Sequence, residues 1–129
     1  MYPATFEAKG SSWSSVEHFY QAMKSLDPKF HAKIKMCNDG FMAKRVGGMI
    51  PLRKDWENIK KQVMFYGVKR KFTQNPELAQ KLVNLEEDII FDNTHTDKFW
   101  GVYNGEGQNH LGLILTEVRE ILIALTIPF

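Results

Sequence analysis

Residues 54–75 read KDWENIKKQVMFYGVKRKFTQN, and this stretch decides the fold class. Large apolar side chains recur in it at helical spacing, namely Trp56, Ile59, Val63, Met64, Val68 and Phe72. The pair Asn75-Pro76 ends the pattern, because the residue before a proline disfavours the helical conformation. The stretch therefore predicts a long helix over residues 54–75 with one buried side.

Shorter helices are predicted on both sides of this segment. On its C-terminal side they cover 76–84 and a last helix from about Asn109, which would bury Leu111, Ile114, Leu115, Val118, Ile121, Leu122 and Leu125. On its N-terminal side they cover 16–26, 28–36 and 41–46. The first of these would be capped by Ser14 or Ser15 and would bury Val16, Phe19, Met23 and Leu26.

The remaining segments predict little regular structure. Residues 2–13 favour an irregular strand or hairpin arm, and residues 88–91 favour a short extended run. The Asp-, Asn-, Thr- and Gly-rich residues 92–108 favour a loop, which is long for a chain of this size and therefore points to function. Taken together, the sequence predicts a mainly α fold, a single compact helical domain over residues 1–129 with one or two short β-strands.

Composition excludes several classes of protein. The chain has 129 residues, a net charge of +2 and one cysteine, Cys37, so neither an internal disulfide nor a thiolate zinc cage can form. The apolar stretch 111–129 is interrupted by Glu117, Arg119 and Glu120, which favours a core helix over a membrane span. The stretch MYPATFEAKG lacks the basic and apolar regions of a signal peptide, and a cytoplasmic location without a membrane partner is expected.

A first polar group lies on the predicted helix 16–26. Glu17, Gln21 and Lys24 are spaced by 4 and 3 residues and share one face, with Tyr20 beside them. A carboxylate and a lysine in a partly dry cleft can perform acid–base chemistry, and a desolvated lysine can act as a nucleophile. The alternative is an amphipathic helix with a solvated polar face, and the pattern alone favours this alternative.

A second polar group lies in DKFWGVYNGEGQNHLG, residues 97–112. Asp97 precedes Trp100 in a glycine-rich loop, where an aromatic ring beside a carboxylate can stack on a base. Asn109 leads into a helix N-terminus, which can hold a phosphate or a sugar hydroxyl. The plain alternative is that Trp100 fills the core, the glycines make turns and Asn109 caps the helix.

Charged residues elsewhere give weaker indications. The four histidines, at positions 18, 31, 95 and 110, lack metal-ligand spacing, so no metal site is expected, and packing is the favoured role of His18. Arg53 follows a Gly-Gly turn and could bind phosphate, although an ordinary surface role fits the spacing better. A basic run of Lys60, Lys61, Lys69, Arg70 and Lys71 favours a solvated helix face over a phosphate-facing strip.

Three ordered motifs resemble one family. WSSVEHFYQAMK (13–24) resembles the W-x-S-V-E-H-x-Y-Q-A-x-K segment of the NADAR family, the YbiA-like N-glycosidases. RKDWENIKKQVMFYGVKRKFTQN (53–75) resembles the family's R-x-D-W-x-x-x-K-x-x-V-M segment with its closing K-F-x-Q-N. DKFWG and GEGQNHLGLILTEVRE resemble its final motifs. The resemblance spans nearly the whole chain and reverses the preference for a solvated first helix.

The resemblance implies a mainly helical enzyme that hydrolyses N-glycosidic bonds to ribose, without a metal or a redox cofactor. Family members act on phosphoribosyl-aminopyrimidine intermediates of riboflavin biosynthesis or remove ADP-ribose from guanine in DNA. Matching positions imply Glu17, Lys24 and Asp97 as catalytic residues. They imply a substrate-binding set of Tyr20, Gln21, Arg53, Trp100 and Asn109.

The sequence departs from the family pattern at three places. The family's Leu-Ser-Asn before Tyr-Pro does not precede Tyr2-Pro3, Asp92 replaces a glutamate, and Tyr103 replaces a glycine. These departures bear on substrate choice. They also keep open an alternative function, a module that binds ADP-ribose or a nucleotide without hydrolysing it.

Overall fold

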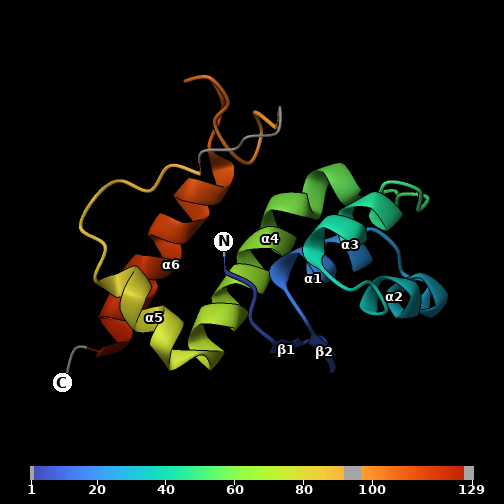
Figure 1. Ribbon diagram of the computed structural model, residues 1–129, viewed down its shortest axis with the longest axis horizontal. Coiled ribbons are helices and arrows are strands. Elements are labelled where there is room, and N and C mark those ends of the chain that lie inside the picture. The colour runs from blue at the N-terminus through green and yellow to red at the C-terminus, as the bar shows by residue number, and fades with distance from the viewer. Residues whose placement is uncertain (1, 92–96, 127–129) are drawn as a thin grey trace. The chain divides into compact units, whose positions relative to one another are not determined.

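A long helix, α4 (Trp56–Gln74), organises the N-terminal part of the chain (Figure 1). The computed structural model describes residues 2–91 and 97–126, which fall into two compact units, Met1–Asn75 and Pro76–Phe129. The single domain expected over residues 1–129 stays a prediction. The helix predicted over 54–75 is confirmed, and its buried residues include Trp56, Met64, Val68 and Phe72.

A two-stranded antiparallel hairpin opens the first unit. Strand β1 (Phe6–Ala8) pairs with β2 (Ser11–Trp13), with Phe6 opposite Trp13. Its two-residue turn has positive φ at Lys9 (54°) and Gly10 (75°), which suits the twist of a tight hairpin. The Glu7 amide donates to Gln74 Oε1 at 2.7 Å, so the hairpin is fixed to the end of α4. The hairpin arm predicted in residues 2–13 is confirmed.

Three short helices follow: α1 (Val16–Ala22), α2 (Pro28–Lys35) and α3 (Gly40–Gly47). Each begins at a side-chain cap, from Ser15, Asp27 and Asp39 respectively, which accepts a backbone N–H of the first turn. Their positions confirm the three helices predicted there, but α1 ends four residues earlier than expected. Leu26 lies beyond its end and is 72% exposed, so its predicted burial is wrong.

Helix α1 packs against α2, α3 and α4 (Figure 1). Its buried residues lie all around the helix and include His18, Phe19, Tyr20 and Gln21. At the crossing with α4, Gly67 faces Phe19, and a Cβ there would lie only 2.9 Å from the Phe19 ring. The pattern's preference for a solvated polar face on this helix was therefore wrong, because α1 has three helical neighbours.

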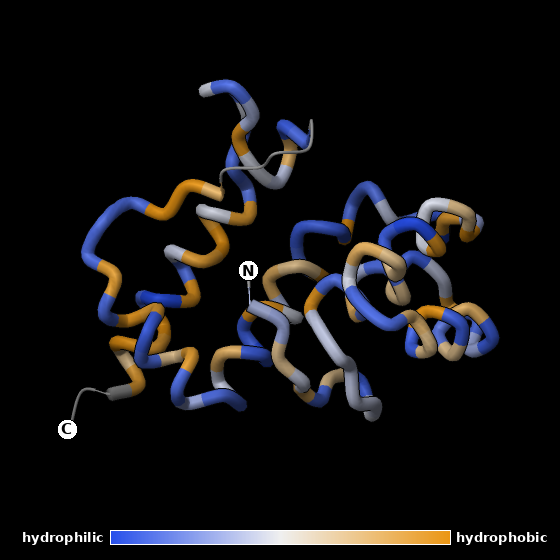
Figure 2. The backbone as a smooth tube through the Cα atoms, in the orientation of Figure 1, coloured by the Kyte–Doolittle hydropathy of each residue, from blue (hydrophilic) through white to orange (hydrophobic). Residues whose placement is uncertain are grey.

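The second unit contains α5 (Pro76–Val83) and α6 (His110–Thr126), which confirms the two helices predicted there, and the two pack against each other. Hydrophobic and hydrophilic residues alternate along α6 (Figure 2), and its buried side carries Leu111, Ile114, Leu115, Val118 and Leu122. Leu125, which was predicted to be buried, is 70% exposed. None of the described helices is long and apolar enough to cross a bilayer.

The segments between α5 and α6 are irregular. Residues 88–91 belong to no strand, and the extended run expected there stays a prediction. Residues 97–108 form turns and bends that include an isolated bridge between Tyr103 and Glu106, as expected of a loop. Residues 92–96, with Asp92 and His95, lie outside the described residues. The described parts are thus mainly helical with one two-stranded sheet, which confirms the predicted fold class.

Candidate functional site

Three of the predicted site residues lie on one face of α1, and a fourth follows the helix. At 3.6 residues per turn, Glu17, Tyr20 and Gln21 fall within an arc of about 100° on α1, and Lys24 lies two residues beyond its last residue, Ala22. The side-chain amide of Gln21 donates to Glu17 Oε1 at 3.0 Å. Glu17 also lies in the first turn of α1, where the helix dipole favours a negative charge. The structure therefore holds the Glu17 carboxylate in a defined position on the helix.

Lys24 lies just beyond the end of α1, and its surroundings lower the pKa of its ammonium group. Burial lowers the pKa of Lys24, the nearby positive charge of Lys44 lowers it further, and the negative charge of Glu17 acts in the opposite direction. Burial is the largest of the three influences. A lowered pKa increases the neutral amine fraction, which is the nucleophilic form. The direction of this pKa shift is the one that favours a nucleophilic lysine.

Tyr20 forms the wall beside these polar groups. It is only 6% exposed, and its ring centroid lies 5.0 Å from that of Trp56 at the start of α4. Lys24 Nζ lies 6.0 Å from the Tyr20 centroid, within the range of a cation–π contact. Because most of the Tyr20 ring is covered, its predicted stacking on a substrate base stays a prediction.

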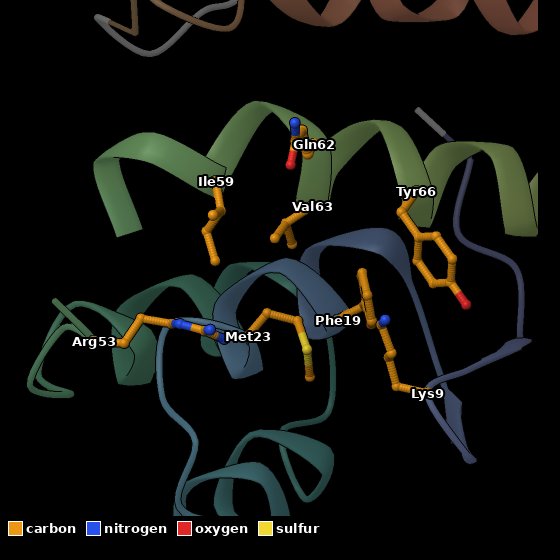
Figure 3. Close-up of a pocket in the computed structure, with 8 residues that line it drawn as sticks. All are labelled: Lys9, Phe19, Met23, Arg53, Ile59, Gln62, Val63 and Tyr66. Atoms are coloured by element: carbon orange, nitrogen blue, oxygen red, sulfur yellow. The ribbon is translucent and has the colours of Figure 1, made fainter. Parts of the chain in front are cut away.

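Arg53 lies at the end of a groove between α1 and α4. Its backbone N–H donates to the carbonyl of Lys24 at 2.8 Å, and its guanidinium binds both carboxylate oxygens of Asp55 at 2.6 and 3.0 Å. The groove has a volume of about 330 Å³. Figure 3 shows its lining residues, which are Lys9, Phe19, Met23, Arg53, Ile59, Gln62, Val63 and Tyr66. An apolar floor with a cation near each end suits a flat ligand that carries an anionic group.

In the second unit, Asp97 organises the aromatic turn that follows it. Its Oδ1 accepts the backbone N–H groups of Phe99 and Trp100 at 2.9 and 3.0 Å. The rings of Phe99 and Trp100 meet edge to face, with centroids 4.7 Å apart. The Trp100 ring is partly exposed, so it retains surface for a ligand.

Asn109 acts as a clamp at the start of α6. Its Oδ1 accepts the Phe91 amide at 2.8 Å, and its Nδ2 donates to the Ile89 carbonyl at 2.9 Å. Its φ of 54° is unusual for a residue other than glycine, and Gly112 leaves room for its amide. Both ends of the Asn109 side chain are thus engaged in holding the chain, instead of capping α6 as the plain alternative had it. Its substrate contact stays a prediction.

His18 has a structural role, which confirms the prediction of packing. Its Nε2 lies 3.0 Å from the carbonyl of Cys37, and since a carbonyl only accepts, this nitrogen carries the proton. Its Nδ1 lies 2.6 Å from Ser15 Oγ. Both ring nitrogens therefore have hydrogen-bond partners within the protein, as a packing role requires.

The predicted site residues divide between the two units. The structure brings Glu17, Tyr20, Gln21 and Lys24 together with Arg53 nearby in the first unit. Asp97, Trp100 and Asn109 lie within the second unit. Tyr103, which stands where the family pattern has a glycine, forms an isolated β-bridge with Glu106 in the loop of the second unit. That all eight side chains form one pocket stays a prediction.

Four residues that contact or influence the site residues of the first unit were not predicted as part of the site from the sequence. Trp56 backs Tyr20, Lys44 influences Lys24, and Gly40 and Gly47 place α3 directly against α1. The two glycines are seven residues apart, which is two helical turns, so they lie on the same face of α3. The seven-residue spacing could have indicated a close helix contact in the sequence. Gly47, however, fits a turn with Gly48 equally well.

Among the described residues 2–91 and 97–126, no group of three or more His, Cys, Asp or Glu side chains could hold a metal ion.

Comparison with known proteins identifies the family. A model of the NADAR domain matches residues 1–123. The chain belongs to the NADAR domain family. It is 39% identical over 116 residues to the N-glycosidase YbiA of Shigella flexneri serotype 5b, covering 88% of this chain and 72% of that protein. An N-glycosidase of Nostoc punctiforme is 32% identical over 124 residues, covering 92% of this chain and 80% of the relative.

The NADAR fold is also known from a solved structure. The NMR structure of the Escherichia coli protein YbiA matches with a TM-score of 0.83 and 34% identity, covering 97% of this chain and 77% of that one. The family and the extent of these alignments show that this NADAR chain is an enzyme of the N-glycosidase class. The resemblance inferred from the three motifs is confirmed.

Proposed function

We propose that this enzyme hydrolyses the N-glycosidic bond between a ribose and a base, using Glu17 on α1 and Lys24 just beyond the end of that helix. The proposal rests on the pair formed by Glu17 and Lys24. A half-buried lysine with a lowered pKa lies near a carboxylate that the Gln21 amide holds at 3.0 Å. Such a pair can supply both proton transfer and a nucleophile to the C1 atom of the sugar.

Two routes use the same residues. In the first, water attacks C1 while Glu17 and Asp97 stabilise the positive charge on the sugar and take up the water proton, and the base leaves protonated. In the second, the Lys24 amine displaces the base from C1, and the base departs with a proton from the amine. The bond between C1 and the ring oxygen then opens to give an imine, and water hydrolyses this imine to release the sugar and the free lysine. Trp100 and Tyr20 would contact the base, and Arg53 and Asn109 would bind phosphate or ribose oxygens.

The substitution Glu17→Gln tests the carboxylate. It keeps the shape of the side chain and removes its charge, so we expect the turnover rate to fall at least ~100-fold, as for other positioned acids and bases. Turnover would be measured as base release by mass spectrometry. A variant with near wild-type turnover would remove Glu17 from the mechanism.

The covalent route has a separate test at Lys24. Borohydride reduces an imine, so treatment during turnover should leave a stable sugar adduct on Lys24 that is absent from Lys24→Ala. The adduct would be located by peptide mass spectrometry. A wild-type enzyme that turns over without trapping would leave direct attack by water as the mechanism.

The substrate is proposed as either an aminopyrimidine intermediate of riboflavin biosynthesis or ADP-ribosylated guanine in DNA. Relatives favour the first: a riboflavin biosynthesis protein of Vibrio vulnificus is 37% identical, although this chain matches only 34% of its length. A chloroplastic riboflavin biosynthesis protein of Zea mays is 33% identical over 21% of its length.

The basic run gives limited support for a DNA substrate. Lys71 is 1% exposed and belongs to the interior, so the predicted solvated strip loses one of its charges. Lys60 pairs with Glu57 at 2.8 Å, and Arg70 Nε donates to the Glu7 carbonyl at 3.0 Å. Because Lys60 and Arg70 make these contacts within the protein, less of the positive charge in this run is free to bind DNA phosphates.

Incubation of the chain with both substrates distinguishes them and also tests the alternative function. Release of one free base, read by mass spectrometry, would identify the substrate. Tight binding of ADP-ribose or a nucleotide without release of either base would indicate the non-hydrolysing module. A ribosylated base as partner and a cytoplasmic location both stay predictions.

A further inference from the structure

Gly47 and Gln21 meet where α3 packs against α1. A Cβ on Gly47 would overlap Gln21 Oε1 and would lie 2.8 Å from Gln21 Cδ and 2.9 Å from Gln21 Cβ. Real Cβ atoms do not approach other heavy atoms this closely. Gln21 is itself only 3% exposed, so it is enclosed by the protein. The amide of Gln21 therefore occupies the volume that any side chain at position 47 would need.

The orientation of this amide is determined by Glu17. Gln21 Nε2 donates to Glu17 Oε1 at 3.0 Å, and a reversed amide would place two oxygens against each other. With the N–H facing Glu17, Gln21 Oε1 lies against Gly47 and is buried without a hydrogen-bond partner among the described residues. A buried acceptor without a partner is costly. The unpaired Gln21 Oε1 is thus the cost of the hydrogen bond between Gln21 Nε2 and the Glu17 carboxylate.

Helix preference alone would not select glycine here. Gly47 ends α3 within the helix and lacks the positive φ that requires glycine. Alanine is a better helix former than glycine at such a position. The absence of a side chain at position 47 is therefore explained by the space that Gln21 occupies, not by the backbone.

We propose that Gly47 is a positioning residue of the hydrolytic reaction: its missing side chain gives Gln21 the room to hold the Glu17 carboxylate toward the sugar. The inference rests on the proposed function of Glu17. Gly47 touches no substrate, and its effect passes through Gln21. A side chain at position 47 would displace the amide, and the carboxylate would lose its fixed direction.

Gly47→Ala tests this inference, and Gly48→Ala is its matched control. Gly48 is exposed and helical, and a Cβ there would meet only carbonyl oxygens of its own helix at 3.5 and 3.6 Å. We expect Gly47→Ala to lower kcat by about 10- to 100-fold, the effect of misplacing a catalytic group, with a much smaller change in KM. Gly48→Ala should leave both constants unchanged.

A double-mutant cycle separates positioning from general damage. A Gln21→Gly background removes all three Gln21 atoms that a Cβ on Gly47 would meet, including Gln21 Cβ, so adding Gly47→Ala there should cost no further activity. An effect of Gly47→Ala that does not pass through Gln21 would instead add its loss to that of Gln21→Gly. Additive losses would overturn the inference.

An NMR measurement gives a readout that does not depend on activity. The side-chain amide signals of Gln21 should shift in Gly47→Ala and in Glu17→Ala, and should stay in place in Gly48→Ala. Unshifted signals in Gly47→Ala would overturn the inference. If Glu17→Gln retains turnover, the proposed function fails, whereas loss in Glu17→Gln with full kcat in Gly47→Ala overturns only the inference.

Discussion

The charge state of Lys24 is set by three influences that substitution can separate. Burial and Lys44 disfavour its ammonium form, and Glu17 favours it. Glu17→Gln removes a stabilising negative charge, so we expect the pKa of Lys24 to fall further. Lys44→Met removes a repelling positive charge, so we expect the pKa of Lys24 to rise. NMR titration of the Lys24 side chain with labelled lysine would measure both changes.

The control for this prediction is Lys33→Met. Lys33 is exposed on α2 and has no influence on Lys24 in the structure, so the Lys24 titration should be unchanged. Equal shifts in Lys33→Met and Lys44→Met would mean that overall charge, not the local arrangement, governs Lys24.

At the scale of helices, periodicity predicts long elements better than it predicts their surroundings. The apolar spacing of α4 and α6 indicated the helices and most of their buried residues, because each helix has one covered side. Helix α1 has only seven residues and three neighbours, so its polar Gln21 is buried although its sequence pattern resembles a surface helix. A pattern in one segment does not show how many other segments will cover it.

The same limit applies to the candidate site. The motif in 13–24 and its spacing predicted Glu17, Gln21 and Lys24 on one face, as the structure has them. The contacts of Gly47 and Trp56 come from segments far along the chain, and no local pattern encodes them. Asn109 shows a further limit, since its residue type fits a cap, a ligand contact or a clamp equally well.

The start of α6 is predicted to depend on the Asn109 clamp. Asn109→Ala removes two hydrogen bonds to the 89–91 segment and keeps an unfavourable positive φ, so a loss of about 1–3 kcal/mol in unfolding free energy is expected. Asn109→Gly also removes the bonds but tolerates the backbone conformation. Thermal unfolding should therefore rank wild type above the glycine variant and the glycine variant above the alanine variant.

Asn109→Asp refines this comparison. The aspartate can still accept the Phe91 amide, but it loses the donor to the Ile89 carbonyl and places two acceptors together. We expect it to be less stable than wild type. Wild-type stability in all three variants would show that the amide does not hold the segment, and would leave Asn109 available for a ligand.

The stability of the folded molecule is predicted to depend on pH through Lys71. This side chain is 1% exposed and donates to the backbone carbonyl of Tyr2, so it ties the N-terminal segment to α4. Burial lowers the pKa of Lys71 from 10.5 to about 8. Between these two values the unfolded chain binds more protons than the folded one, so stability increases as pH rises.

Comparison with Lys71→Met isolates this contribution, because methionine has a similar length and does not titrate. The stability of wild type relative to the variant should increase between pH 8 and 10.5, by up to about 3 kcal/mol, since each pKa unit corresponds to about 1.4 kcal/mol. Below pH 8 the difference should be constant, because Lys71 is then protonated in both states. Urea unfolding followed by tryptophan fluorescence would measure it. A difference that stays constant from pH 7 to 10.5 would show that the folded protein does not penalise the charged form of Lys71.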